Sequence, residues 1–194
     1  MNQCRKALNM TKDEYEKIYL ETKLQKINMY KATMPDLINT VEMIDYLDSI
    51  DYFTAPSSFK KHGAWIGGNF DHSFKVTEYL LENKDAVWER KESPYIIGMF
   101  HDLCKSDIRT FRIAKGEVKI SYKSYKDRRH SEKSLELIGK VMELTMEEKL
   151  CIYYHMGEHN DDYEYRDLME RMIQQYPNIQ LTQEADTKAA AGGV

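Results

Sequence analysis

Histidine and aspartate residues recur along this chain of 194 residues in an order that suits one metal site. The set comprises His72, the adjacent pair His101 and Asp102, His130, His155, and Asp186 near the C-terminus. Imidazole nitrogens combined with carboxylate oxygens suit a borderline transition metal such as iron, manganese or zinc, whereas all-oxygen sites suit magnesium or calcium. The chemistry that such a site favours is hydrolysis.

Each of these histidines also has an ordinary interpretation. A lone histidine on an apolar helical face is more often a hydrogen-bonded core residue than a metal ligand. The pair His101 and Asp102 differs, because an aspartate that follows the apolar run Ile96–Phe100 would be costly to bury without a partner, and a cation relieves that cost. Two adjacent helical residues point about 100° apart, so both reach one ion only if their helix runs tangentially past it.

Composition limits the classes of protein. The hydrophobic fraction is 42% and the charged fraction is 31%, which are typical of a soluble globular protein of one domain. Three widely spaced cysteines make a disulfide framework improbable, and Cys104 is expected to be a small buried side chain. The sequence has no apolar run of about 20 residues and no apolar signal region, so we expect a cytoplasmic protein that does not enter the membrane.

The apolar pattern predicts helices almost throughout. Thr11 with Glu14 and Thr145 with Glu148 are capping-box patterns that predict helix starts. Asp71 is expected to open the helix that carries His72. Ser93 is expected to cap a helix with proline at its first position, which places Ile97, His101 and Lys105 in one line along that helix.

One segment departs from this helical pattern. Residues 105–129 contain nine basic and three acidic side chains, a net charge of +6 in a chain whose net charge is −4. Alternation around Lys115 and Gly116 predicts a short β-hairpin between two metal-ligand segments. Such a hairpin, with Arg109 and Arg112, could hold a phosphate-rich substrate near the site. The alternative is a solvated hairpin whose basic side chains only aid solubility.

The order of these residues resembles the HD superfamily of metal-dependent phosphohydrolases. The resemblance lies in five segments: "HGAWIGGNFDHSFKV", "IIGMFHDLCKSD", "RRHSEKSLELI", "IYYHMGEH" and "EADTKAA", and the first of them is similar to the YhaM-like exoribonucleases. It covers roughly residues 53–190. It implies an all-α fold, a single HD-domain helical bundle with the β-hairpin inserted near the active site. We expect residues 1–52 to be N-terminal helices that pack on a core of residues 53–190, and 191–194 to be a frayed tail.

The resemblance also implies roles for individual residues. His72, His101, Asp102 and Asp186 would bind a first ion, and His130 and His155 would either bind a second ion or face the substrate. We favour two ions, from Fe, Mn, Co, Ni or Zn, with Mg also allowed. Lys105 would contact a substrate phosphate and act with His101 and Asp102 in catalysis. His62 could touch substrate or only anchor its loop, and His159 is expected to be solvated.

These expectations predict a hydrolase that cleaves a phosphate ester of a nucleotide or short oligonucleotide through a metal-activated water. One alternative is a phosphodiesterase or 3′ exonuclease on single-stranded nucleic acid, although such proteins usually have broader basic surfaces. Another is an inert HD module that senses a nucleotide or binds a protein, although inert members would be expected to lose ligands. The substrate, the metal and whether the protein forms a homo-oligomer stay open.

Overall fold

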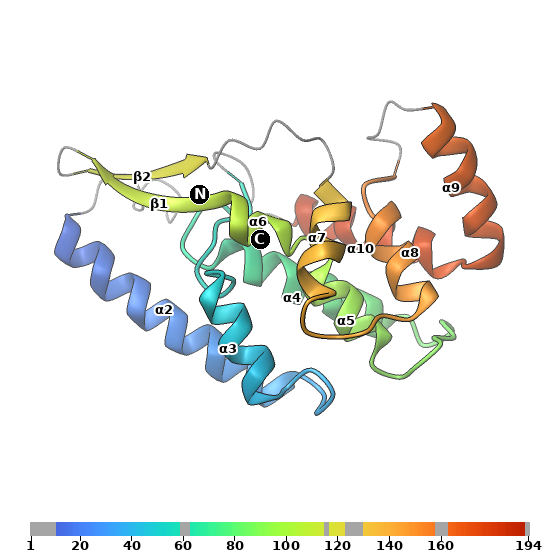
Figure 1. Cartoon of the computed structure of the whole chain (residues 1–194), viewed down its shortest axis with the longest axis horizontal. Coiled ribbons are helices and arrows are strands. Elements are labelled where there is room, and N and C mark those ends of the chain that lie inside the picture. Colours follow the sequence, from blue (N-terminus) through green and yellow to red (C-terminus); the bar gives the residue numbers. More distant parts are fainter. Residues whose placement is uncertain (1–10, 59–62, 115–116, 123–129, 158–162, 193–194) are drawn as a thin grey trace. The chain divides into compact units, whose positions relative to one another are not determined.

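The computed structural model describes residues 11–58, 63–114, 117–122, 130–157 and 163–192, with only the backbone given for 107–114 and 117–122 except at Val118. The chain is mainly helical, as expected (Figure 1). The elements, in chain order, are α2 (Lys12–Thr33), α3 (Val41–Ser49), α4 (Gly68–Glu82), α5 (Ser93–Phe100), α6 (Cys104–Ile108), β1 (Arg109–Ala114), β2 (Glu117–Tyr122), α7 (His130–Ile138), α8 (Met146–Tyr154), α9 (Tyr163–Gln175) and α10 (Asn178–Ala191).

The described residues form two compact units. The first contains the chain up to His72 together with residues 104–122, and the second contains Ser73–Leu103 with residues 130–192. The boundary at His72 falls inside α4, so this one helix continues from the first unit into the second. The expected division into residues 1–52 and 53–190 stays a prediction.

The first unit has an aromatic core. The rings of Tyr30, Tyr52, Phe53 and Phe70 pack against one another with centroids between 5.6 and 5.9 Å apart. All four side chains are almost completely buried. The hydroxyl of Tyr30 donates a hydrogen bond of 2.7 Å to the carbonyl oxygen of Ile38, so its polar end is also satisfied inside the protein.

The second unit is a bundle in which α8 is the central helix. Helix α8 contacts α5, α7 and α10, and α10 also contacts α9 (Figure 1). The core between these helices is built from buried side chains of α4, α5, α8, α9 and α10, among them Val76, Ile97, Cys151, Met169 and Ile179. The bundle therefore brings together segments that lie more than 100 residues apart in sequence, such as those of Val76 and Ile179.

Both predicted capping boxes are confirmed. The hydroxyl of Thr11 accepts from the backbone N–H of Glu14, whose carboxylate accepts from the backbone N–H of Thr11. Thr145 and Glu148 make the same reciprocal pair at the start of α8. Each pair satisfies backbone donors that the first helical turn leaves without a partner.

Three predicted helix boundaries are wrong. Helix α4 begins at Gly68 rather than at Asp71, whose carboxylate instead accepts from Trp65 and pairs with Lys26. Ser93 lies inside the first turn of α5, where its hydroxyl donates to a carboxylate rather than capping the helix. Lys105 does not continue the helix of His101, because α5 ends at Phe100 and Lys105 belongs to the separate helix α6.

Strands β1 and β2 form an antiparallel pair in the basic segment. The register runs from Arg109 opposite Tyr122 to Ala114 opposite Glu117, and it places Arg112 opposite Lys119. The position of this pair relative to the histidines stays a prediction. Among the described residues, no helix combines the length and the apolar character that crossing a membrane requires.

Candidate metal centre

His101 is held at the C-terminal end of α5. It is fully buried, and its Nδ1 atom lies 2.9 Å from the carbonyl oxygen of Gly98, three residues earlier. A carbonyl oxygen can only accept, so the Nδ1 atom carries the proton of this hydrogen bond. The Nε2 atom is left with its lone pair in the neutral ring, and it lies 3.4 Å from Oδ2 of Asp102 and 3.7 Å from Oδ1 of Asp186.

The two adjacent candidate ligands, His101 and Asp102, lie in a turn just after the end of α5. The helix stops at Phe100, and residues 101–103 form a turn in which His101 caps α5 and keeps helical backbone angles. Both side chains are buried and face each other. The expectation that a continuous helix passes the site is therefore wrong, and the turn replaces it.

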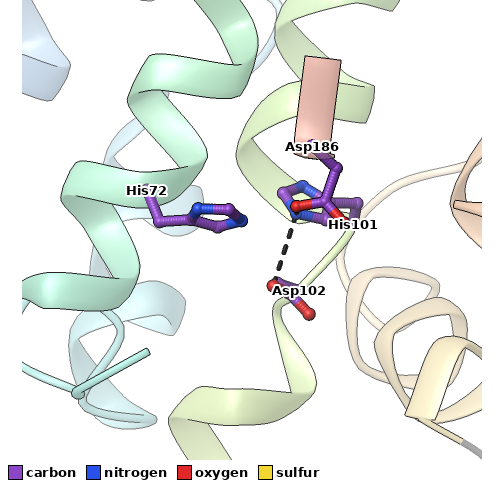
Figure 2. Close-up of side chains that lie close together, drawn as sticks. All are labelled: His72, His101, Asp102 and Asp186. Carbon is purple, nitrogen blue, oxygen red and sulfur yellow. Dashed lines mark ion pairs between the residues drawn. The ribbon is translucent and has the colours of Figure 1, made fainter. Parts of the chain in front are cut away.

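His72 and Asp186 complete this first group. Figure 2 shows the side chains of His72, from α4, and Asp186, from α10, directed toward His101 and Asp102. Each of the four residues offers one ligand atom, and these atoms all lie within 4.8 Å of one another. His72 is buried, whereas the side chain of Asp186 is 22% exposed, so solvent reaches the group beside Asp186.

His155 repeats the arrangement of His101 at the end of α8. Its Nδ1 atom lies 2.7 Å from the carbonyl oxygen of Ile152, again three residues earlier, so Nδ1 carries the proton there too. The Nε2 atom of His155 is buried, has no hydrogen-bond partner in the described part of the chain, and lies 3.7 Å from Oδ1 of Asp102. The rings of His101 and His155 meet edge to face with centroids 5.0 Å apart.

A second group forms around the other oxygen of Asp102. The Nε2 atom of His130, the first residue of α7, lies 3.0 Å from Oδ1 of Asp102. Asp102, His130 and His155 also place one ligand atom each within 4.8 Å of the others. Asp102 therefore belongs to both groups, with Oδ2 facing His101 and Oδ1 facing His130 and His155.

The electrostatics of the site favour positive charge. Burial lowers the pKa of His101, but the carboxylates of Asp102 and Asp186 outweigh that effect and raise the pKa to about 10. The two carboxylates therefore stabilise a cation strongly at this place, despite the loss of water around them.

The residues present fit a divalent metal ion. In both His101 and His155, Nδ1 is bonded to a backbone carbonyl and Nε2 faces a carboxylate oxygen. The raised pKa of His101 places a proton between its Nε2 atom and the carboxylates, and a divalent ion would take the place of that proton. Ligand atoms about 2.1 Å from a shared ion lie roughly 3 to 4 Å apart, and the separations here range from 3.0 to 3.7 Å. Mixed imidazole and carboxylate ligands favour a transition metal.

The structure describes the residues that were expected to contact the substrate only in part. Lys105 is half-buried in α6, and Arg109 and Arg112 lie in β1, where the structure gives the backbone alone. His62 and His159 lie outside the described residues. The roles of these residues stay predictions.

The sequence interpretation overlooked Gly98. A Cβ atom at Gly98 would lie 2.6 Å from the Cα atom of Thr77 in α4, so only glycine permits the helices to approach this closely. The carbonyl oxygen of the same residue holds Nδ1 of His101. A glycine inside an apolar helical segment is the signal that could have revealed this close packing.

Comparison with known proteins identifies the family of the chain. A family model described as HD domain matches residues 69–191, which include all six residues of the two groups. Searches of curated proteins and of solved structures gave no match. Because the family model spans more than half of the chain, the protein belongs to the HD domain family of metal-dependent phosphohydrolases.

Proposed function

We propose that the protein is a phosphohydrolase that cleaves a phosphate ester of a nucleotide or short oligonucleotide with a metal-activated water. The observation that carries the proposal is the position of the buried Asp102 between two groups of histidines, with one carboxylate oxygen directed to each. A carboxylate shared in this way suits two neighbouring ions, and two-ion sites are common in enzymes that act on phosphate esters.

We assign the six residues to two ions. His72, His101, Asp102 and Asp186 would hold the first, and Asp102, His130 and His155 would hold the second. Bound ions would lower the pKa of a water molecule toward neutrality and polarise a phosphoryl oxygen. In the alternative with one ion, His130 and His155 face the substrate instead.

The protein side chains have their own tasks in this mechanism. The hydrogen bonds from Nδ1 of His101 and His155 to backbone carbonyls fix both ring orientations before an ion binds. Burial of His72, His101, Asp102 and His155 excludes bulk water from most of the site, which strengthens electrostatic interactions there. Lys105 and the basic residues of 105–129 would offset the charge that develops on the phosphoryl oxygens.

A hydrolysis screen tests the proposed function. The purified protein is supplied separately with Mn²⁺, Fe²⁺, Co²⁺ or Mg²⁺ and incubated with nucleoside monophosphates, nucleoside triphosphates, cyclic dinucleotides and short oligonucleotides. We expect phosphate or nucleotide release with at least one transition metal. We also expect Asp102→Ala to abolish release and to remove the bound metal, because Asp102 serves both groups.

The control is Asp167→Ala, which removes a partly exposed carboxylate of α9 that pairs with Arg171 four positions later. It should keep the activity and metal content of the wild type. If Asp102→Ala retained as much metal as the wild type, Asp102 would not be a metal ligand and the proposed metal site would be wrong. Metal binding without hydrolysis of any of these substrates would contradict the enzymatic function and favour a binding module.

A further inference from the structure

Helices α5 and α8 begin at one buried carboxylate far from the histidines that they carry. The side chain of Glu148 is completely buried. Its Oε1 atom accepts from Nε of Arg90 at 2.7 Å and from Oγ of Ser93 at 2.9 Å. Its Oε2 atom accepts from Nη2 of Arg90 at 2.6 Å and from the backbone N–H of Thr145 at 2.9 Å.

The adjacent Glu147 connects a third helix. Its Oε1 atom accepts from Nδ2 of Asn178, the first residue of α10, at 2.8 Å. Its Oε2 atom accepts from the backbone N–H of Glu89 at 2.8 Å, just before α5. Asn178 also donates to the carbonyl oxygen of Val87, which joins the start of α10 to the same segment. Glu147 and Glu148, here called the glutamate pair, therefore hold the N-terminal ends of α5, α8 and α10 together.

The spacing from the glutamate pair to the metal ligands is similar in all three helices. Ser93 is eight positions before His101, Asn178 is eight before Asp186, and Glu147 and Glu148 are eight and seven positions before His155. Eight residues of α-helix correspond to about 12 Å. The other ends of the helices also meet, because Nε2 of His101 lies 3.7 Å from Oδ1 of Asp186 and the rings of His101 and His155 are in contact.

We propose that the glutamate pair positions the metal centre from about 12 Å away by fixing how far α5, α8 and α10 extend toward it. The inference rests on the proposed metal binding. A metal site tolerates only about 0.2 Å of error in its ligand distances, so a small slide of one helix along its axis would displace its ligand. Charged hydrogen bonds are short and directional, and in some proteins buried polar or charged groups fix one arrangement of the chain while adding little to the free energy of folding.

The arrangement of the network supports this role over a purely structural one. A carboxylate that only stabilised α8 would need nothing beyond its capping box with Thr145. Both carboxylate oxygens of Glu148 also accept hydrogen bonds from Arg90, just before α5, and the adjacent Glu147 accepts one from the first residue of α10.

The test measures metal affinity rather than turnover. Metal-stripped full-length protein is titrated with Mn²⁺ alone, and the melting temperature of each metal-free variant is recorded. Glu148→Gln keeps the size of the side chain but removes the charge that Arg90 pairs with. We expect the Kd for Mn²⁺ to rise about 10- to 100-fold, the range found when supporting partners of metal ligands are lost. Glu147→Gln should raise Kd by less, because Glu147 accepts from the neutral donors of Glu89 and Asn178, whereas Glu148 pairs with the charged Arg90.

The control is Met169→Ala in α9, which removes a buried side chain of the same core but leaves the glutamate pair intact. It should lower the melting temperature at least as much as Glu148→Gln while leaving the Kd near the wild-type value. The inference would be overturned if Met169→Ala and Glu148→Gln lowered the melting temperature by the same amount and also raised the Kd by the same factor. If Glu148→Gln does not fold, the same comparison is decided by Glu147→Gln, for which an unchanged Kd would overturn it.

The same titration separates this inference from the proposed function. A wild-type protein that binds no Mn²⁺ or other transition metal would contradict the proposed function. A wild-type protein that binds Mn²⁺, together with glutamate variants that bind it equally well, would contradict only the positioning role.

Discussion

His101 and His155 differ from His130 in how the protein holds them. The first two are buried at the C-terminal ends of α5 and α8, and both rings are fixed by a hydrogen bond from Nδ1 to the carbonyl three residues earlier. His130 is the first residue of α7, and its side chain is 25% exposed. A ligand whose orientation is set before binding loses less freedom when the ion arrives. In a two-ion site, we therefore expect the second ion, which lies beside the more exposed His130, to exchange more easily than the first.

Replacing these histidines one at a time should produce the largest difference. We expect His101→Ala to remove the first ion and to weaken the second, whereas His130→Ala should leave the first ion bound and lower the metal-to-protein ratio by about half. His155→Ala should also lower the ratio by about half. Elemental analysis after dialysis measures the ratio. An unchanged ratio with a raised KM in His130→Ala or His155→Ala would instead make these histidines substrate contacts in a one-ion site.

A smaller effect is expected from the packing behind His101. Gly98→Ala would push α5 away from Thr77 of α4, and overpacking of this kind costs about 1 to 3 kcal/mol. It would also move the carbonyl that holds Nδ1 of His101, so metal affinity should fall together with the melting temperature.

Gly192→Ala is the matched control for this substitution. A Cβ atom there would make an ordinary contact of 3.5 Å at the end of α10. Its melting temperature and metal affinity should stay close to those of the wild type. If Gly98→Ala melts at the wild-type temperature, the close approach of α4 and α5 does not constrain the site.

The smallest effect is expected from the basic segment, which contributes charge but no candidate ligand. Reversing Arg109, Arg112 and Lys119 together to Glu should raise KM severalfold at low ionic strength and leave the metal content unchanged. Single exposed charges are each worth about 0 to 1 kcal/mol, which is why three are changed. The increase should grow with the number of substrate phosphates and shrink as salt is added. A KM equal to that of the wild type on every substrate at low salt would make the segment a solvated hairpin.

The six residues that the structure brings together could be named from the sequence because their types and order resemble those of the HD superfamily. Their division into two groups was expected from the same resemblance, but which oxygen of Asp102 faces each histidine could not be predicted, because it depends on the folded geometry. The helix starts at Thr11 and Thr145 could be predicted, because a capping box involves only residues three positions apart. The end of α5 at Phe100 could not, because no glycine or proline marks the turn before α6.

The glutamate pair shows a different limit of sequence interpretation. Glu148 was identified as part of a capping box, which describes its contact with Thr145. Its contacts with Arg90 and Ser93 join residues more than 50 positions apart, and a pattern of neighbouring residues in the sequence cannot predict such contacts. Ser93, Glu147 and Asn178 each lie eight positions before a candidate ligand, but this spacing can be interpreted only once the structure shows that α5, α8 and α10 meet at both ends.

The ends of α5 and α8 have a further consequence for ion binding. The aligned peptide dipoles of an α-helix place about half a negative charge at its C-terminal end. Because His101 is the C-cap of α5 and His155 is the C-cap of α8, two such ends lie at the site. Each favours a cation by about 0.3 to 1 kcal/mol, and this backbone contribution remains when any single ligand side chain is replaced. The attraction of the site for divalent ions is therefore partly a property of the fold itself.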